Sequence, residues 1–174
     1  MNSLTQSCRV LLLCAVLVAI AVPAHGQSKT AALNTEQLTA QSDIVVAGKV
    51  AGLVSEWSPK HDRIQTRVTV SVDQSMKGNA AGSAITVLVP GGEVDGVGEW
   101  YSHSVSFQNN EDVVLFAKQE SGHYRVVGGE AGKLSVQRDE KTGAKFIPHM
   151  GSLEEFSKNI VRISKAQSSG QIKN

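Results

Sequence analysis

Few side chains in this chain are suited to catalysis or metal binding. Four histidines follow residue 26: His61, His103, His123 and His149. None of them forms the HxH or HExxH pair that places two zinc ligands on one element. Glu99 and His103 lie four residues apart, as ligands on a helix would, but the surrounding WYSHS is typical of a strand or loop. The pattern therefore favours separate surface histidines over a metal site.

Two serines, Ser102 and Ser104, flank His103 and suggest a Ser-His nucleophile. The G-x-S-x-G motif is absent, however, and neighbouring residues of a strand point to opposite faces, so His103 is poorly placed to activate either serine. Catalytic triads assemble from distant segments. A hydrolase without a recognisable motif therefore stays open as an alternative, and no catalytic residue is assigned.

A glycine-rich segment runs from Gly91 to Glu99. Such segments can cradle phosphate with backbone N–H groups, but this one carries Glu93, Asp95 and Glu99 with no following lysine, so its charge repels phosphate. The three carboxylates are of the type that binds calcium. We predict a flexible, solvated loop and keep calcium binding as an alternative.

Aromatic residues near two turns are the best candidates for partner binding. Trp57 and His61 lie in EWSPKHDR between two predicted strands, and Trp100 and Tyr101 follow the glycine-rich segment. Exposed aromatic side chains in loops are suited to contacts with a protein or a glycan. The alternative is that the tryptophans cap the ends of the hydrophobic core.

The first 26 residues are typical of an export signal. Arg9 precedes an apolar run from Leu11 to Val22, and Ala24-His25-Gly26 offers small residues for cleavage before Gln27. The apolar run is too short for a membrane span, which needs about 20 residues. We therefore expect a secreted or periplasmic protein with no stable membrane anchor after cleavage.

Composition after residue 26 excludes several classes of function. The whole chain has 17 basic and 16 acidic residues, and only Arg9 among these precedes Gln27, which leaves 16 of each sign. Both cysteines, Cys8 and Cys14, also lie in the leader, so the remaining chain has no thiolate nucleophile and no disulfide. Zero net charge, no basic run and export together exclude nucleic acid as the partner, and no cofactor motif is present.

Hydrophobic periodicity predicts a mainly β domain. Residues 43–57 are rich in β-branched residues and apolar on both faces in their first half, with Gly48 and Gly52 predicted to allow a bend or bulge. Alternation from Arg63 to Asp73 predicts a strand with one buried and one wet face. Further strands are predicted at 83–89, 100–107 (weak), 112–118, 124–127, 133–138 and 144–147.

Helices are predicted at both ends of this series of strands. Asn34 or Thr35 caps a short helix that ends near Ala40, and Ser152 with Glu155 forms a capping box for a C-terminal amphipathic helix. The expected organisation is a signal peptide at 1–26, a flexible lead-in at 27–33, a single domain at 34–166 and a flexible tail at 167–174.

The order of elements resembles a known family. The stretches that carry the likeness are SDIVVAGKV (42–50), SMKG (75–78), ITVLVP (85–90), EDVVLFAK (111–118) and GHYRVV (122–127). This series is similar to the netrin-like module, as in tissue inhibitors of metalloproteinases and in secreted bacterial proteins of the same pattern. The resemblance covers about Thr35 to Val136 and implies a closed or partly open OB-like Greek-key barrel.

The resemblance does not carry the family's inhibitory mechanism with it. Those inhibitors bind the protease zinc through an N-terminal cysteine, whereas no cysteine follows Gln27 here. Shared fold does not imply shared function. The leading hypothesis is a non-enzymatic binding module for a protein or glycan partner at Trp57, His61, Trp100 and Tyr101. An inhibitor or accessory domain of an extracellular metalloprotease is the second hypothesis, and a hydrolase is the third.

Overall fold

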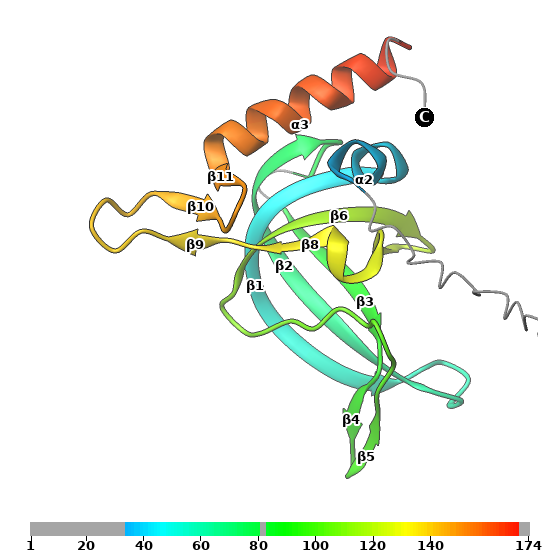
Figure 1. Ribbon diagram of the computed structural model, residues 1–174. Helices are drawn as coiled ribbons and strands as arrows, with labels where there is room; N and C mark the ends of the chain where they lie inside the picture. Colours follow the sequence, from blue (N-terminus) through cyan, green and yellow to red (C-terminus); the bar gives the residue numbers. More distant parts are fainter. Residues whose placement is uncertain (1–33, 81–82, 171–174) are drawn as a thin grey trace, which may run out of the picture. The chain divides into compact units, whose positions relative to one another are not determined.

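The computed structural model describes residues 34–80 and 83–170, which fall within one structural unit, Ala32–Asn174. The predicted export signal (1–26), the predicted lead-in (27–33) and residues 171–174 of the predicted tail lie outside the described residues. The described part is mainly β, with a multi-stranded sheet and a C-terminal helix, as the periodicity predicted (Figure 1).

The short helix α2 (Thr35–Gln41) begins at Asn34, one of the two predicted caps. The Asn34 side chain accepts a hydrogen bond from the backbone N–H of Gln37 at 2.8 Å, and the Gln37 side chain accepts one from the backbone N–H of Asn34 at 3.1 Å. This reciprocal capping satisfies two N–H groups that a helix otherwise leaves unpaired. Leu38 of α2 is buried.

Two long antiparallel strands, β1 (Ile44–Trp57) and β2 (Ile64–Lys77), form the centre of the fold. The first five residues of β1 are all buried, which confirms that this half of the strand is covered on both faces. The register of β1 against β2 shifts next to Gly48 and again before Gly52, which confirms the irregularities predicted there. A side chain at Gly48 would overlap the carbonyl of Ser71, so the close approach of β1 to β2 requires glycine.

The alternating pattern of β2 is confirmed. Val68, Val70 and Val72 are buried, while Thr69 is half-buried and Ser71 is exposed between them. β3 (Ala84–Pro90) pairs with β2 along its whole length and repeats the alternation. One face of this β1-β2-β3 meander is therefore apolar, as period-two patterning requires.

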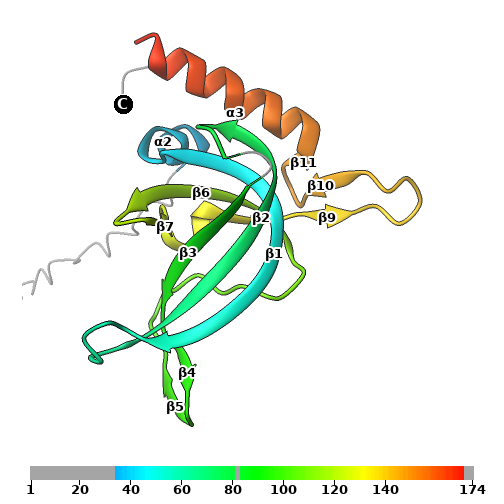
Figure 2. The same ribbon diagram turned by 180° about the vertical axis from the view of Figure 1, so that it is seen from behind.

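The remaining strands of the main sheet are β6 (Asp112–Glu120), β7 (His123–Val126) and β8 (Lys133–Ser135). The strand order is β1-β2-β3-β7-β6-β8, and β6 also pairs with β1. β1 thus pairs with β2 along one edge and with β6 along the other, as Figures 1 and 2 show. The contact of β3 with β7 is parallel, and all other pairings in this sheet are antiparallel.

The smaller elements complete the described chain. They are β4 (Gly92–Val94) with β5 (Val97–Glu99) as one hairpin, the 3-10 turn η1 (Gly129–Gly132), and a three-stranded sheet of β9 (Gln137–Arg138), β10 (Lys145–Ile147) and β11 (Gly151–Ser152). The single strand predicted at 133–138 is divided between β8 and β9, with Val136 buried between them.

Two predictions for the region around the glycines were wrong. The segment predicted to be a flexible loop forms the β4–β5 hairpin, because Asp95 and Gly96 both adopt the left-handed conformation (φ 51° and 78°) that suits a two-residue hairpin turn. The weak strand predicted at 100–107 does not form. Ser104 N–H donates to the Tyr101 carbonyl at 3.2 Å, and the left-handed His103 (φ 65°) in this turn interrupts extended backbone.

The C-terminal helix α3 (Leu153–Ser168) packs on the side of β1, β2 and β6 opposite to the core of the meander. Ser152 caps it by accepting from the N–H of Glu155 at 3.2 Å, and Phe156 meets Phe116 of β6 edge to face at 6.5 Å. The helix continues to Ser168, so the first two residues of the predicted tail are helical.

Candidate binding site

The two loops predicted to bind a partner lie at the same end of the sheet. In Figures 1 and 2 the β4–β5 hairpin and the turn between β1 and β2 occupy the end opposite to α2 and α3. Glu99 at the end of β5 joins them, because its Oε2 accepts hydrogen bonds from the N–H of Ile64 at 2.9 Å and from the Tyr101 hydroxyl at 3.0 Å. A carboxylate that accepts two such bonds holds the start of β2 against the segment after β5.

Trp57 and His61 contact each other within the β1–β2 turn. Their rings stack with centroids 5.9 Å apart and an interplanar angle of 24°. Ser58 closes the turn, since its hydroxyl donates to Asp62 Oδ1 at 2.6 Å and its carbonyl accepts from the N–H of His61 at 2.8 Å. The hydrogen bond from Ser58, followed by that from Arg63, holds the pKa of Asp62 below its ordinary value. The turn is therefore an ordered feature that presents a half-buried tryptophan.

Trp100 is the most exposed large apolar side chain of the described residues, at 80%. Its six-membered ring lies against the backbone of Gly98, where an added Cβ would overlap the ring. Because the ring rests on a strand backbone, it is held in place while most of its surface faces solvent. The sequence analysis identified Trp100 but missed the role of Gly98. The only sequence signal for that role is a glycine two residues before the tryptophan.

A pocket of about 430 Å³ lies beside Trp100 and Tyr101, and we call it the Trp100 pocket. Its lining comes from four segments: Leu53 and Ser55 of β1, Thr66 and Val68 of β2, Val89 to Gly92 at the end of β3 and the start of β4, and Glu99 to Tyr101 with Ser104 to Phe107. Trp57 and His61 are not in this lining. The structure thus brings Trp100 and Tyr101 together at one pocket and places Trp57 and His61 in the neighbouring turn.

Three hydroxyl groups of the Trp100 pocket are hydrogen-bonded within the protein. Thr66 Oγ1 donates to the carbonyl of Gly91 at 2.7 Å, and Ser55 Oγ lies 3.0 Å from Thr66 Oγ1. Because Thr66 uses its proton on Gly91, Ser55 donates in that pair. Ser104 Oγ donates to the carbonyl of Pro90 at 3.0 Å. These groups fix the wall of the pocket and leave its interior mainly apolar.

Tyr101 remains a hydrogen-bond donor at neutral pH. Its hydrogen bond to Glu99 raises the pKa of its hydroxyl, and partial burial and the Glu99 charge act in the same direction. The ring of Tyr101 is 46% exposed. Its position at the pocket rim is therefore set by Glu99, the residue that also holds Ile64.

The residues considered for catalysis are not arranged as a reactive site. Ser104 bonds to a backbone carbonyl, and no hydrogen bond connects the His103 side chain to either flanking serine in the part of the chain that the structure describes. Within residues 34–80 and 83–170, no three His, Cys, Asp or Glu side chains are grouped closely enough to hold a metal ion. His123 lies on β7, and His149 lies in the turn before β11.

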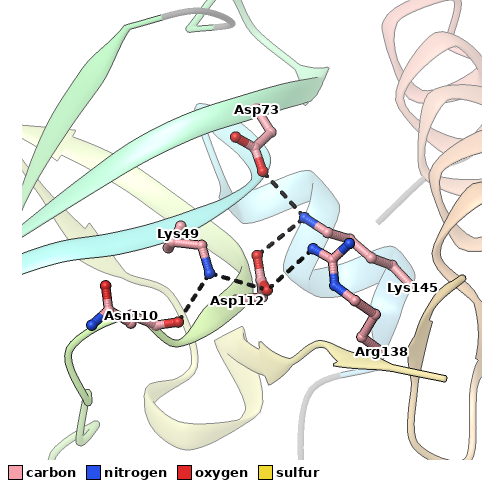
Figure 3. Close-up of polar contacts among 6 residues, drawn as sticks. All are labelled: Lys49, Asp73, Asn110, Asp112, Arg138 and Lys145. Atoms are coloured by element: carbon pink, nitrogen blue, oxygen red, sulfur yellow. Dashed lines mark hydrogen bonds and ion pairs between the residues drawn. The ribbon is translucent and has the colours of Figure 1, made fainter. Parts of the chain in front are cut away.

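Sequence reasoning missed a cluster of charged residues, which is shown in Figure 3. None of its members lines the Trp100 pocket. Asp112 of β6 accepts from Lys145 at 3.0 Å and from Lys49 at 3.4 Å, and Lys145 also reaches Asp73 at 3.3 Å. Arg138 Nη2 lies 3.9 Å from Asp112. The cluster joins the β9–β10 hairpin to β1, β2 and β6, and no local pattern indicates it because these elements are widely separated in the chain.

The pKa of Asp112 is lowered by this cluster. Burial opposes ionisation, but the hydrogen bonds and charges of Lys145 and Lys49 outweigh it and bring the pKa below its ordinary value. The same Asp112 and Asp73 carboxylates raise the pKa of Lys145 against the opposing effect of burial. We assign the cluster a structural role, because the acid and the bases satisfy one another.

Comparison with known proteins adds no relative. No protein-family model matches the chain, and no curated protein matches it. Among the helices that the structure describes, none has the length and apolar character needed to span a membrane.

Proposed function

We propose that this protein is an exported, non-enzymatic binding module whose scaffold is an OB-like barrel of the netrin type. The strand pairings support the scaffold, because β1-β2-β3-β7-β6 leads back to β1 through the β1–β6 ladder. The three-stranded meander β1–β3 meets the β6–β7 hairpin through one parallel contact, and this non-sequential order is what a five-stranded Greek-key barrel of the OB type requires. The export signal predicted at residues 1–26 supports a secreted or periplasmic location.

The proposed binding site is the Trp100 pocket with Trp100 and Tyr101 at its rim. The observation that carries this assignment is the position of Trp100, which is 80% exposed yet rests on the backbone of Gly98 beside a pocket of about 430 Å³. Exposed aromatic residues held in one position are frequent centres of binding energy, and pockets of this size accept small ligands or side chains. The stacked pair of Trp57 and His61 enlarges the available surface on the neighbouring turn.

Capture experiments test this proposal. Immobilised protein should retain a component of the culture fluid or periplasm of the source cells, and Trp100→Ala should lose it. Met150→Ala is the matched control, because Met150 is also exposed (49%) but borders a different pocket. Retention of the same component by folded Trp100→Ala protein would contradict the proposed site.

A further inference from the structure

We propose that the Trp100 pocket binds a large apolar side chain of a protein partner, presented beside basic residues. This inference rests on the proposed function and specifies the partner, which the proposed function leaves as a protein or a glycan. The inference depends on three features of the site: hydroxyl groups in the pocket wall that are already hydrogen-bonded, the apolar surface inside the pocket, and the negative charge of the β4–β5 hairpin.

The pocket wall offers few free hydrogen-bonding groups. Of the four serine and threonine hydroxyls in the lining, those of Ser55, Thr66 and Ser104 donate within the protein, two of them to backbone carbonyls, and the fourth belongs to the exposed Ser106. Because these three hydroxyls have used their protons, a sugar would find few donors there for its own oxygens, and each buried polar group left unpaired costs about 1–3 kcal/mol. The arrangement therefore disfavours a glycan and favours an apolar group.

The surface inside the pocket is suited to such a group. Leu53, Val68 and Val89 come from three adjacent strands, and Phe107, from the segment that follows Tyr101, lines the pocket with them. Val68 and Val89 are buried and support the floor of the pocket from the core, while the partly exposed Leu53 and Phe107 offer its accessible apolar surface. An apolar side chain that entered the pocket would extend the core and leave the hydrogen bonds of Ser55, Thr66 and Ser104 intact.

The β4–β5 hairpin beside the pocket is acidic. Glu93, Asp95 and Glu99 lie in or at the end of this hairpin, which has no basic residue. None of the three forms an ion pair with any residue among 34–80 and 83–170. On the neighbouring β1–β2 turn, Arg63 is already paired with Asp62 at 3.3 Å, and Lys60 adds one positive charge. Lysine or arginine beside the inserted side chain would complement the hairpin.

Selection of ligands from two libraries tests the inference directly. A random peptide-display library and an array of neutral and acidic glycans would be applied to the protein from Gln27 onward. The variants would be Trp100→Ala, the pair Glu93→Gln/Asp95→Asn, and Met150→Ala as the control. Asn is the appropriate replacement at residue 95, because it tolerates the left-handed conformation found there (φ 51°).

We expect the selected peptides to contain a large apolar residue next to lysine or arginine. Trp100→Ala should weaken their binding by about 30-fold or more, the loss associated with an aromatic centre of binding energy. The double substitution Glu93→Gln/Asp95→Asn should weaken binding by about threefold to tenfold at low ionic strength and by much less at high salt. Met150→Ala should bind like the unaltered protein.

The outcomes separate this inference from the proposed function. If glycans bind in a Trp100-dependent manner and peptides do not, the inference is overturned and the proposed function stands. If acidic peptides are selected, the charge argument is wrong. If Trp100→Ala protein retains the selected peptides, or neither library gives a ligand that depends on Trp100, both the inference and the proposed site fail.

Discussion

The substitution Gly98→Ala tests whether Trp100 acts through its position as well as its presence. The added Cβ would lie 3.0 Å from Trp100 Cζ2 and closer still to Cζ3 and Cη2. The ring must then move by at least about 1 Å to restore ordinary carbon contacts. Because Trp100 is exposed, it can move without disturbing the core.

The expected effects on stability and binding therefore differ. Gly98 is paired with Glu93 in the β4–β5 hairpin and has a backbone conformation open to alanine, so the free energy of unfolding should change by less than about 1 kcal/mol. Removal of Trp100 sets the upper limit of the binding loss, at about 2 kcal/mol or more. A displaced ring should lose about half of that, which is roughly fivefold in affinity.

Calorimetric titration with the captured partner would measure the affinity, and thermal unfolding would measure the stability. The indole N–H resonance of Trp100 would report the displacement independently. Gly52→Ala is the matched control, because a Cβ at Gly52 has no atom within 4 Å. Full affinity in Gly98→Ala protein with a shifted indole resonance would refute the argument that binding depends on the position of the Trp100 ring against Gly98.

Three further predictions concern stability and processing. Asp112→Asn should lower the free energy of unfolding, measured by denaturant titration, by about 1–2 kcal/mol at neutral pH. Because the pKa of Asp112 is lowered in the folded state, the ionised carboxylate stabilises the protein above its ordinary pKa of about 3.9, and this stabilisation is lost as the pH falls through the folded pKa. The stabilities of the two proteins should therefore converge in acid. Gly48→Ala should lower the free energy of unfolding by about 3 kcal/mol in the same assay, because its Cβ would overlap the Ser71 carbonyl and backbone atoms cannot move aside as a flexible side chain can. An unchanged unfolding midpoint would contradict the close approach of β1 to β2 at Gly48. N-terminal sequencing of the exported protein should begin at Gln27, and a sequence that begins at Met1 would refute the cleaved signal.

The strands of the main sheet were predictable because burial there follows sequence periodicity. Val68, Val70 and Val72 alternate with the less buried polar residues Thr69 and Ser71, and the continuous apolar run that starts β1 identifies a strand covered on both faces. The glycines Gly48 and Gly52 marked the irregularities of register. These signals are local, so one sequence is sufficient to read them.

The β4–β5 hairpin was missed although its signal is also local. Asp95-Gly96 is a favoured pair for a two-residue turn, but the flanking strands are only three residues each and contain Gly92 and Gly98. Glycine weakens strands, so the composition of this segment favoured a loop, whereas the Asp95-Gly96 pair favoured a hairpin turn. The structure shows that the turn residues determined the outcome.

The candidate site was only half predictable for a different reason. Aromatic type and loop position identified Trp100 and Tyr101, but the Trp100 pocket also requires Leu53, Val68 and Phe107, which belong to three separate segments. The link through Glu99 to Ile64 spans 35 residues. No pattern within a single sequence reveals which distant residues share a pocket, whereas the pairing of β1, β2 and β3 determines it.

The two ends of β2 explain why binding and stability should respond to different substitutions. At one end, Gln74 bonds to Ser157 of α3 at 2.7 Å and Lys77 bonds to the carbonyl of Thr39 in α2 at 2.6 Å, next to the core that contains Phe116 and Phe156. At the other end, Ile64 is held by Glu99, and Trp100 contributes almost no buried surface. Stabilisation scales with the apolar area removed from water, so the folding energy comes from the two buried core clusters and not from Trp100. The exposed Trp100 has apolar area that only a partner can bury, and its loss should therefore be measured in affinity and not in the unfolding midpoint.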